Sequence, residues 1–120
     1  MRRLSILLVV AAAALALALT ASASPTASKK LVGTVGPGFT ITLKQGSKMV
    51  KKLKPGKYTI VIHDKASSHN FRLKGPGLNK QITTVGFSGT KTVKVTLKKG
   101  KYTYDCDPHF ALMHHSFTVS

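Results

Sequence analysis

Three side chains with soft donor atoms lie close together near the C-terminal end of the sequence. Cys106, the only cysteine, is followed by His109 and then by Met113. A thiolate, an imidazole and a thioether suit copper better than magnesium, calcium or manganese, which prefer oxygen ligands. A second imidazole is available upstream, at His69. The residue types therefore predict one metal site that joins two segments distant in the sequence.

Each of these side chains has a commoner role when it is considered alone. A methionine that follows Ala111 and Leu112 is usually a core residue, a single histidine usually lies in a loop without a metal, and a single cysteine can be a buried thiol. The spacing Cys-x-x-His-x-x-x-Met, combined with an upstream His-Asn-Phe, favours a metal site over separate coincidences. Structural zinc sites generally contain several cysteines, so zinc fits this chain poorly.

The sequence offers little support for catalysis. A nucleophilic pair of Cys106 and His109 would need a third group to orient the imidazole, and none is identifiable. Only three residues are acidic, Asp64, Asp105 and Asp107, which argues against chemistry by paired carboxylates. We therefore do not expect an enzyme.

The first residues have the pattern of an export signal. Two arginines precede an uncharged apolar run at residues 4–19, and Ala21-Ser22-Ala23 provides a small-x-small cleavage site. A transmembrane anchor is the alternative, but the alanine-rich run and the cleavage site favour export to the periplasm, the cell envelope or the medium. The cleaved protein would have no membrane span. The expected parts are a signal peptide at 1–23, a flexible tail at 24–30 and one domain at 31–120.

Alternating apolar and polar residues predict short β-strands in that domain. The expected strands are residues 31–35, 39–43, 49–50, 58–63, 71–73, 93–98, 102–106 and 116–119. Residues 58–63 carry apolar side chains on both faces, as in a central strand. The sequence of residues 53–60 is echoed at 97–104, which suggests two similar hairpin corners. We therefore predict an all-β fold, a Greek-key β-sandwich of about seven to eight strands.

The segments that carry the soft donors resemble the cupredoxin family of plastocyanin, azurin and amicyanin. The resemblance covers residues 31–120 and is strongest in Ser68-His69-Asn70-Phe71 and in the Tyr-Asp-Cys-Asp-Pro-His-Phe-Ala-Leu-Met of residues 104–113. Its Cys-x-Pro-His is similar to plastocyanin and amicyanin, whereas its His-x-x-x-Met is similar to azurin. The resemblance implies that one type 1 copper ion is held by His69, Cys106, His109 and Met113.

The same resemblance implies roles for neighbouring residues. Asn70 would connect the two ligand-bearing loops through hydrogen bonds. Pro108 has no amide hydrogen, so it cannot donate a hydrogen bond to the sulfur. Phe110, Ala111 and Leu112 would form the apolar patch through which electrons are exchanged.

Two further histidines follow Met113, and one departs from the family pattern, which usually has glycine at the position of His115. If that position needs a positive φ, a histidine there costs about 1 kcal/mol. Alternation with Phe117 and Val119 predicts that the His115 ring lies near the core. His114 or His115 could then compete with the thioether, but we expect Met113 to remain the axial ligand.

The chain is strongly basic, with a formal charge of +16 that becomes +14 when the two signal-peptide arginines are removed. Export and the lack of a stacking or helical reading motif argue against nucleic acid as the partner. Lysines that alternate with apolar residues are expected on the solvated face of the sandwich, where they protect strand edges. The remaining charge predicts attraction to an acidic redox protein or to an anionic envelope surface.

The sequence therefore predicts an exported, monomeric blue-copper protein that transfers single electrons by Cu(II)/Cu(I) cycling. A copper-binding or copper-delivery protein without an electron-transfer role is the alternative.

Overall fold

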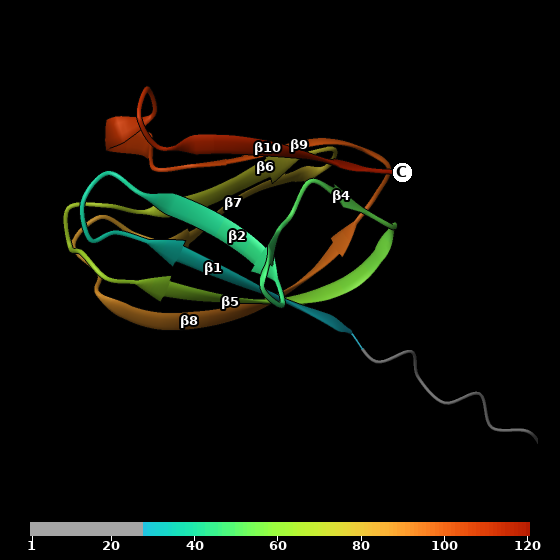
Figure 1. Ribbon diagram of the computed structural model, residues 1–120, viewed down its shortest axis with the longest axis horizontal. Helices are drawn as coiled ribbons and strands as arrows, with labels where there is room; N and C mark the ends of the chain where they lie inside the picture. The colour runs from blue at the N-terminus through green and yellow to red at the C-terminus, as the bar shows by residue number, and fades with distance from the viewer. Residues whose placement is uncertain (1–27) are drawn as a thin grey trace, which may run out of the picture.

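The computed structural model describes residues 28–120, so the predicted signal peptide lies outside the described residues. The described chain forms two five-stranded sheets that pack face to face (Figure 1). The predicted all-β sandwich is confirmed, with ten strands in place of the seven or eight expected. Among residues 28–120, no helix has the length and apolar character needed to cross a membrane.

One sheet has the strand order β3-β2-β1-β5-β8, and the other has the order β4-β10-β9-β6-β7. The strands of the first sheet are β1 (Lys29–Val35), β2 (Ile41–Gln45), β3 (Lys48–Met49), β5 (Gly56–Asp64) and β8 (Gly89–Leu97). The strands of the second sheet are β4 (Lys52–Leu53), β6 (Phe71–Gly75), β7 (Leu78–Thr83), β9 (Gly100–Asp105) and β10 (His114–Val119). A single 3₁₀ turn, η1 (Asp107–His109), lies between β9 and β10 in the described chain.

Strand β5 occupies the central position that its sequence predicts. It lies between β1, which is parallel to it, and β8, which is antiparallel. Tyr58, Ile60 and Ile62 point into the core and are at most 2% exposed, while the alternate residues are half-buried. Every second side chain of the strand points into the space between the sheets, because successive side chains of a strand point to opposite faces.

The repeated sequence forms two similar corners, as predicted, but each corner connects strands of different sheets and is therefore not a hairpin. The Tyr58 hydroxyl donates a hydrogen bond to the Lys54 carbonyl at 2.6 Å. The Tyr102 hydroxyl likewise donates to the Lys98 carbonyl at 3.1 Å, and it accepts from the Lys98 amide at 2.9 Å. In each copy a buried tyrosine is thus bonded to the backbone four residues earlier, which fixes the turn that leads into β5 or β9.

The structure departs from the sequence prediction at several strands, and the two-residue strand β4 is one that was not expected. Strand β7 was not expected, because only Ile82 and Thr83 of its six residues are buried. It lies at the edge of its sheet, where a strand needs little apolar alternation. Strand β1 begins at Lys29, inside the segment expected to be a flexible tail. Strand β2 begins at Ile41 rather than at Phe39, which lies in the preceding loop and is 57% exposed.

Candidate metal centre

Three loops meet at one end of the sandwich, opposite the end at which β1 begins (Figure 1). They connect β1 to β2, β5 to β6, and β9 to β10. The β5–β6 loop carries His69, and the β9–β10 loop carries Cys106, His109 and Met113. The topology therefore brings together the two segments that were predicted to share a metal.

Three donor atoms converge between these loops. His69 Nδ1 and His109 Nδ1 are 3.0 Å apart, and Cys106 Sγ is 3.6 Å from each of them. Among the histidine, cysteine and acidic side chains of residues 28–120, these three form the only group whose donor atoms lie close enough together to hold a metal ion. The centre of this triangle lies about 2.0 Å from each donor atom, close to the metal–imidazole bond length of about 2.0–2.1 Å known for zinc.

The chemistry of the donor set fits copper. One thiolate and two imidazoles form a soft, mixed set, and the two imidazoles face each other with the same ring nitrogen. Cys106 is completely buried and His69 is 3% exposed, whereas His109 is half-buried. The sulfur is therefore shielded from solvent, and His109 is the donor nearest to the protein surface.

Backbone hydrogen bonds close the β9–β10 loop around these donors. The Cys106 amide donates to the Met113 carbonyl at 3.0 Å, and the Met113 amide donates to the His109 carbonyl at 2.9 Å. Pro108 lies in the first turn of η1, where the missing amide hydrogen costs no helical hydrogen bond. The Met113 side chain is 0% exposed and belongs to the same buried cluster as Cys106.

Asn70 links the two ligand-bearing segments directly. It is 1% exposed, and its Nδ2 donates to Asp107 Oδ2 at 2.8 Å. Its Oδ1 accepts from the Asp107 amide at 2.7 Å. Because Asn70 follows His69 and Asp107 follows Cys106, these two bonds limit how far the imidazole and the sulfur can separate.

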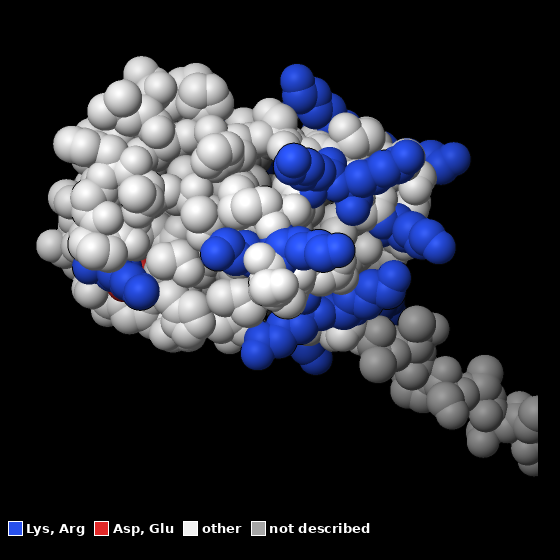
Figure 2. All heavy atoms as spheres, in the orientation of Figure 1, with Lys and Arg blue, Asp and Glu red and all other residues white. Residues whose placement is uncertain are grey.

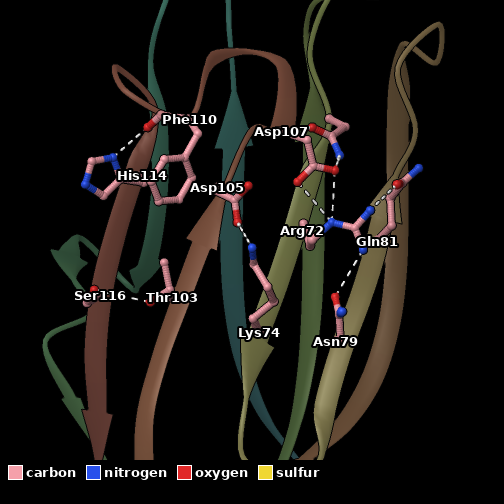
Figure 3. Close-up of polar contacts among 11 residues, drawn as sticks. Arg72, Lys74, Asn79, Gln81, Thr103, Asp105, Asp107, Phe110, His114 and Ser116 are labelled. Carbon is pink, nitrogen blue, oxygen red and sulfur yellow. Dashed lines mark hydrogen bonds and ion pairs between the residues drawn. The ribbon is translucent and has the colours of Figure 1, made fainter.

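A charged network supports this link from the outside (Figure 3). Arg72 Nε donates to both carboxylate oxygens of Asp107, at 3.0 and 2.9 Å. The guanidinium is held in turn by Asn79 and Gln81, which accept from its two terminal nitrogens at 3.1 and 2.7 Å. No sequence signal pairs Arg72 with Asp107, because the contact depends on the register of β6 and β9.

The two aspartates beside Cys106 have opposite pKa shifts. Burial raises the pKa of Asp105, Asp107 adds to the rise, and Lys74, whose Nζ is 3.3 Å from the carboxylate, opposes it. Burial alone would also raise the pKa of Asp107, but hydrogen bonds from Asp105, Arg72 and Asn70 together hold it below the ordinary value. Asp107 is therefore a carboxylate at neutral pH, as its role as an acceptor from Asn70 requires.

We expect Asn70→Ala to weaken copper binding by about 10- to 100-fold, the usual effect of removing a group that orients metal ligands. The free energy of unfolding should fall by about 1–3 kcal/mol, because the substitution breaks two hydrogen bonds at a buried residue. Competition with a copper chelator and urea unfolding measure the two effects. Asn79→Ala is the control, since Asn79 is exposed and contacts only the outer side of Arg72. Equal losses in both variants would contradict the role of Asn70.

Phe39 belongs to this site, although its place was not predicted. Its ring centroid is 5.0 Å from that of His109 and 6.0 Å from that of His69, with its edge toward both imidazoles. Phe39 is 57% exposed, Phe110 is 48% and Leu112 is 68%. With Ala111, these residues form an exposed apolar rim around His109. The alternation of residues 39–43 predicted that Phe39 lies in a strand. Only the preceding chain break at Gly36-Pro37-Gly38 indicated that Phe39 could lie in a loop.

The two histidines after Met113 lie outside the donor cluster. His114 Nδ1 is 2.7 Å from the Phe110 carbonyl, and its ring stacks on Phe110 at 4.7 Å (Figure 3). His115 lies opposite Tyr104 on β9, and its ring centroid is 5.6 Å from that of the buried Tyr104, so the ring borders the core as predicted, although the residue is exposed. No residue other than glycine has a positive φ in residues 28–120, so the suspected strain at His115 is absent.

Comparisons with known proteins agree with this geometry. Residues 35–120 match a family described as copper binding proteins, plastocyanin/azurin family. No curated protein matches the chain significantly. A solved structure of the copper protein rusticyanin has a TM-score of 0.54 and 20% identity, and the match covers 78% of this chain and 80% of that one.

Two other solved structures give similar matches. Reduced rusticyanin has a TM-score of 0.54 at 20% identity, over 78% of this chain and 81% of that one. A Cu(I) amicyanin variant has a TM-score of 0.49 at 14% identity, over 77% of this chain and 83% of that one. At these identities the rusticyanin structures show the shared fold alone, whereas the family match spans most of the described domain. The chain belongs to the plastocyanin/azurin family of copper-binding proteins, the cupredoxins.

Proposed function

We propose that this protein carries single electrons by means of one type 1 copper ion, held by His69, Cys106, His109 and Met113. The observation that carries the proposal is the convergence of two imidazole nitrogens and one buried thiol sulfur within 3.6 Å of one another. Bound copper would supply the one-electron couple between Cu(II) and Cu(I). The residues around it would hold the donors in one arrangement for both oxidation states.

Two features support Met113 as the axial ligand: its side chain is buried, and its backbone is hydrogen-bonded to the other ligand residues of the same loop. Its side chain is fully buried in the same core cluster as Cys106, and its backbone is hydrogen-bonded to both Cys106 and His109. A thioether is a weak ligand, so its contribution would adjust the reduction potential more than the affinity. His114 and His115 are exposed, which favours Met113 over either of them.

The surface around His109 supports exchange of electrons at this end of the molecule. His109 is half-buried, while Phe39, Phe110, Ala111 and Leu112 surround it with exposed apolar groups. Such a patch excludes water when a partner protein docks, and it brings the outer imidazole close to the contact. We propose this apolar rim, which adds Phe39 to the patch expected from the sequence, as the exit and entry point for the electron.

The remaining features of the proposal concern the whole chain. We propose that residues 1–23 are a signal peptide, that cleavage leaves a short tail before one domain, and that the protein acts as a monomer. It would work in the periplasm, the cell envelope or the medium. Its positive charge favours an acidic redox protein or an anionic envelope surface as a partner.

Reversible redox cycling tests the proposed function. The copper-loaded protein of residues 24–120 should lose its blue colour on reduction and regain it on reoxidation, with its copper retained in the presence of a Cu(I) chelator. An electron carrier keeps its copper in both the Cu(II) and the Cu(I) state, because the ligands stay in one arrangement. Transfer of the copper to the chelator upon reduction would instead indicate a copper-delivery protein.

A further inference from the structure

The positive charges of this protein are concentrated at one end of the sandwich. The lysines of segments 29–30, 44–57 and 98–101 are all exposed, and we refer to them as the lysine pole. Strand pairing brings these segments together: Lys29 lies opposite Tyr58, Lys44 opposite Met49, and Thr118 lies between Lys52 and Lys101. Figure 2 shows the basic side chains crowded over the end at which β1 begins, and few of them at the opposite end.

The end with the metal centre has a different charge balance. All three acidic residues of the chain, Asp64, Asp105 and Asp107, lie at this end, where β5 and β9 finish. The nearest basic residues are Arg72 and Lys74, which are paired with Asp107 and Asp105, and the unpaired Lys65 and Lys91. The charge near the proposed copper ligands is therefore nearly balanced, and the net charge of the molecule resides at the lysine pole.

The lysine pole has no acidic counterpart within the protein. The two ion pairs of residues 28–120 involve Arg72 and Lys74, and neither residue belongs to the pole. Like charges that are crowded without partners repel one another and attract an external anionic surface. Strand β1 also begins at this pole, at Lys29.

We propose that the lysine pole docks on anionic phospholipid head groups, with the metal centre directed away from the bilayer. The pole contains lysine and no arginine, and lysine provides point charges rather than the fixed fork that recognises one carboxylate or phosphate. The exposed aromatic residues, Phe39 and Phe110, lie at the other end, so the pole offers no stacking platform for bases. A diffuse field of this kind suits a lipid surface, where clustered basic residues near a membrane segment bind anionic lipids.

This arrangement separates the two surfaces of the molecule. The lysine pole would hold the protein at a membrane, while the apolar rim around His109 would remain free for a redox partner. Of the two partners that the charge suggested, an anionic envelope surface therefore fits the position of the lysines better than an acidic protein docked over the metal. The pole contains none of the proposed copper ligands, so this inference does not depend on the redox proposal.

Cosedimentation with lipid vesicles tests the inference. The copper-loaded protein of residues 24–120 contains every buried core residue that the structure describes, so it should be folded without the N-terminal segment. At low ionic strength it should bind vesicles of phosphatidylcholine mixed with phosphatidylglycerol and leave pure phosphatidylcholine vesicles unbound. Binding should weaken by at least about tenfold near 0.15 M salt, where charges are screened within about 8 Å. Absence of binding to the anionic vesicles at low ionic strength would overturn the inference.

Two double variants with the same net charge separate the lysine pole from charge in general. Lys51→Glu with Lys99→Glu reverses two charges in exposed bends of the pole and should weaken vesicle binding by about tenfold or more. Lys65→Glu with Lys91→Glu reverses two exposed charges near the metal centre and should weaken it much less. The visible spectrum of each loaded variant shows whether the fold is intact. Equal losses of binding in the two variants would mean that the net charge, not the pole, attracts the lipid.

Discussion

Replacing Cys106 by serine should abolish the intense blue absorption of the copper-loaded protein. Only a copper–thiolate bond gives that colour, and Cys106 is the single cysteine of the chain. A serine hydroxyl is a hard, protonated donor and a poor substitute for a thiolate, so copper affinity should also fall. The fold itself should survive, because the side chains differ by one atom and the buried hydroxyl can hydrogen-bond to either imidazole, as the geometry of the sulfur indicates.

His114→Ala is the matched control for this substitution. His114 is the histidine after Met113, it is exposed, and it contacts Phe110 rather than the donor cluster. Its removal should leave the visible spectrum largely unchanged. An unchanged spectrum for Cys106→Ser, recorded beside a fully loaded control, would contradict the assignment of the sulfur as a ligand.

Met113→Leu should raise the reduction potential and change the visible spectrum, while unfolding in urea changes little. Leucine fills nearly the same buried volume, so the free energy of unfolding should fall by less than about 1.5 kcal/mol. Leucine has no lone pair to donate. Because Cu(II) gains more than Cu(I) from an additional ligand, removal of the thioether should destabilise the oxidised state. Voltammetry and absorption spectra of the wild type and the variant measure these effects.

His115→Gly provides the comparison for the axial position. Because His115 is exposed on β10 and lies outside the donor cluster, the potential should stay the same. The backbone there has an ordinary negative φ, so glycine relieves no strain and should destabilise the strand by about 0.5–1 kcal/mol. A shifted potential in His115→Gly with an unaltered one in Met113→Leu would show that the axial ligand is His115.

Much of the metal centre could be predicted from the sequence because three of its donors are local. The spacing from Cys106 to Met113 is set by one short loop, and a loop of this length between adjacent antiparallel strands returns its end to its beginning. Asn70 follows His69 directly, so its place was fixed as soon as His69 was assigned. The strands with one buried face, such as β8 and β10, were recognisable from their alternation alone.

The parts that were missed depend on contacts between segments distant in the sequence. Phe39 reaches the imidazoles only because the β1–β2 loop folds over them, and its own alternation pattern suggested a strand. Arg72 meets Asp107 through the pairing of β6 with β9. His115 shares the strand parity of the buried Phe117 and is nevertheless exposed, so parity alone did not specify its burial. The concentration of lysines at one end likewise emerges only when the three segments of the lysine pole are brought together.

The family and the metal centre together describe a copper protein rather than an enzyme. Two well-separated surfaces follow from the fold: an apolar, nearly neutral end with the donor cluster, and a strongly basic end without ionic partners. The lysines are therefore not only the solvated face of the sandwich, as their alternation along the strands had suggested. With the lysine pole docked as proposed, their position leaves the end with the donor cluster available to a partner.

A titration of the metal-free protein of residues 24–120 with Cu(II) tests the central claim most directly. His69, Cys106 and His109 form one cluster in the described chain, so the blue absorption should rise in proportion to added copper and stop at one equivalent. The bound copper should also protect Cys106 from alkylation at the same stoichiometry. Absorption that never develops, or that saturates at one equivalent while Cys106 remains reactive, would contradict a single copper site built on this cysteine.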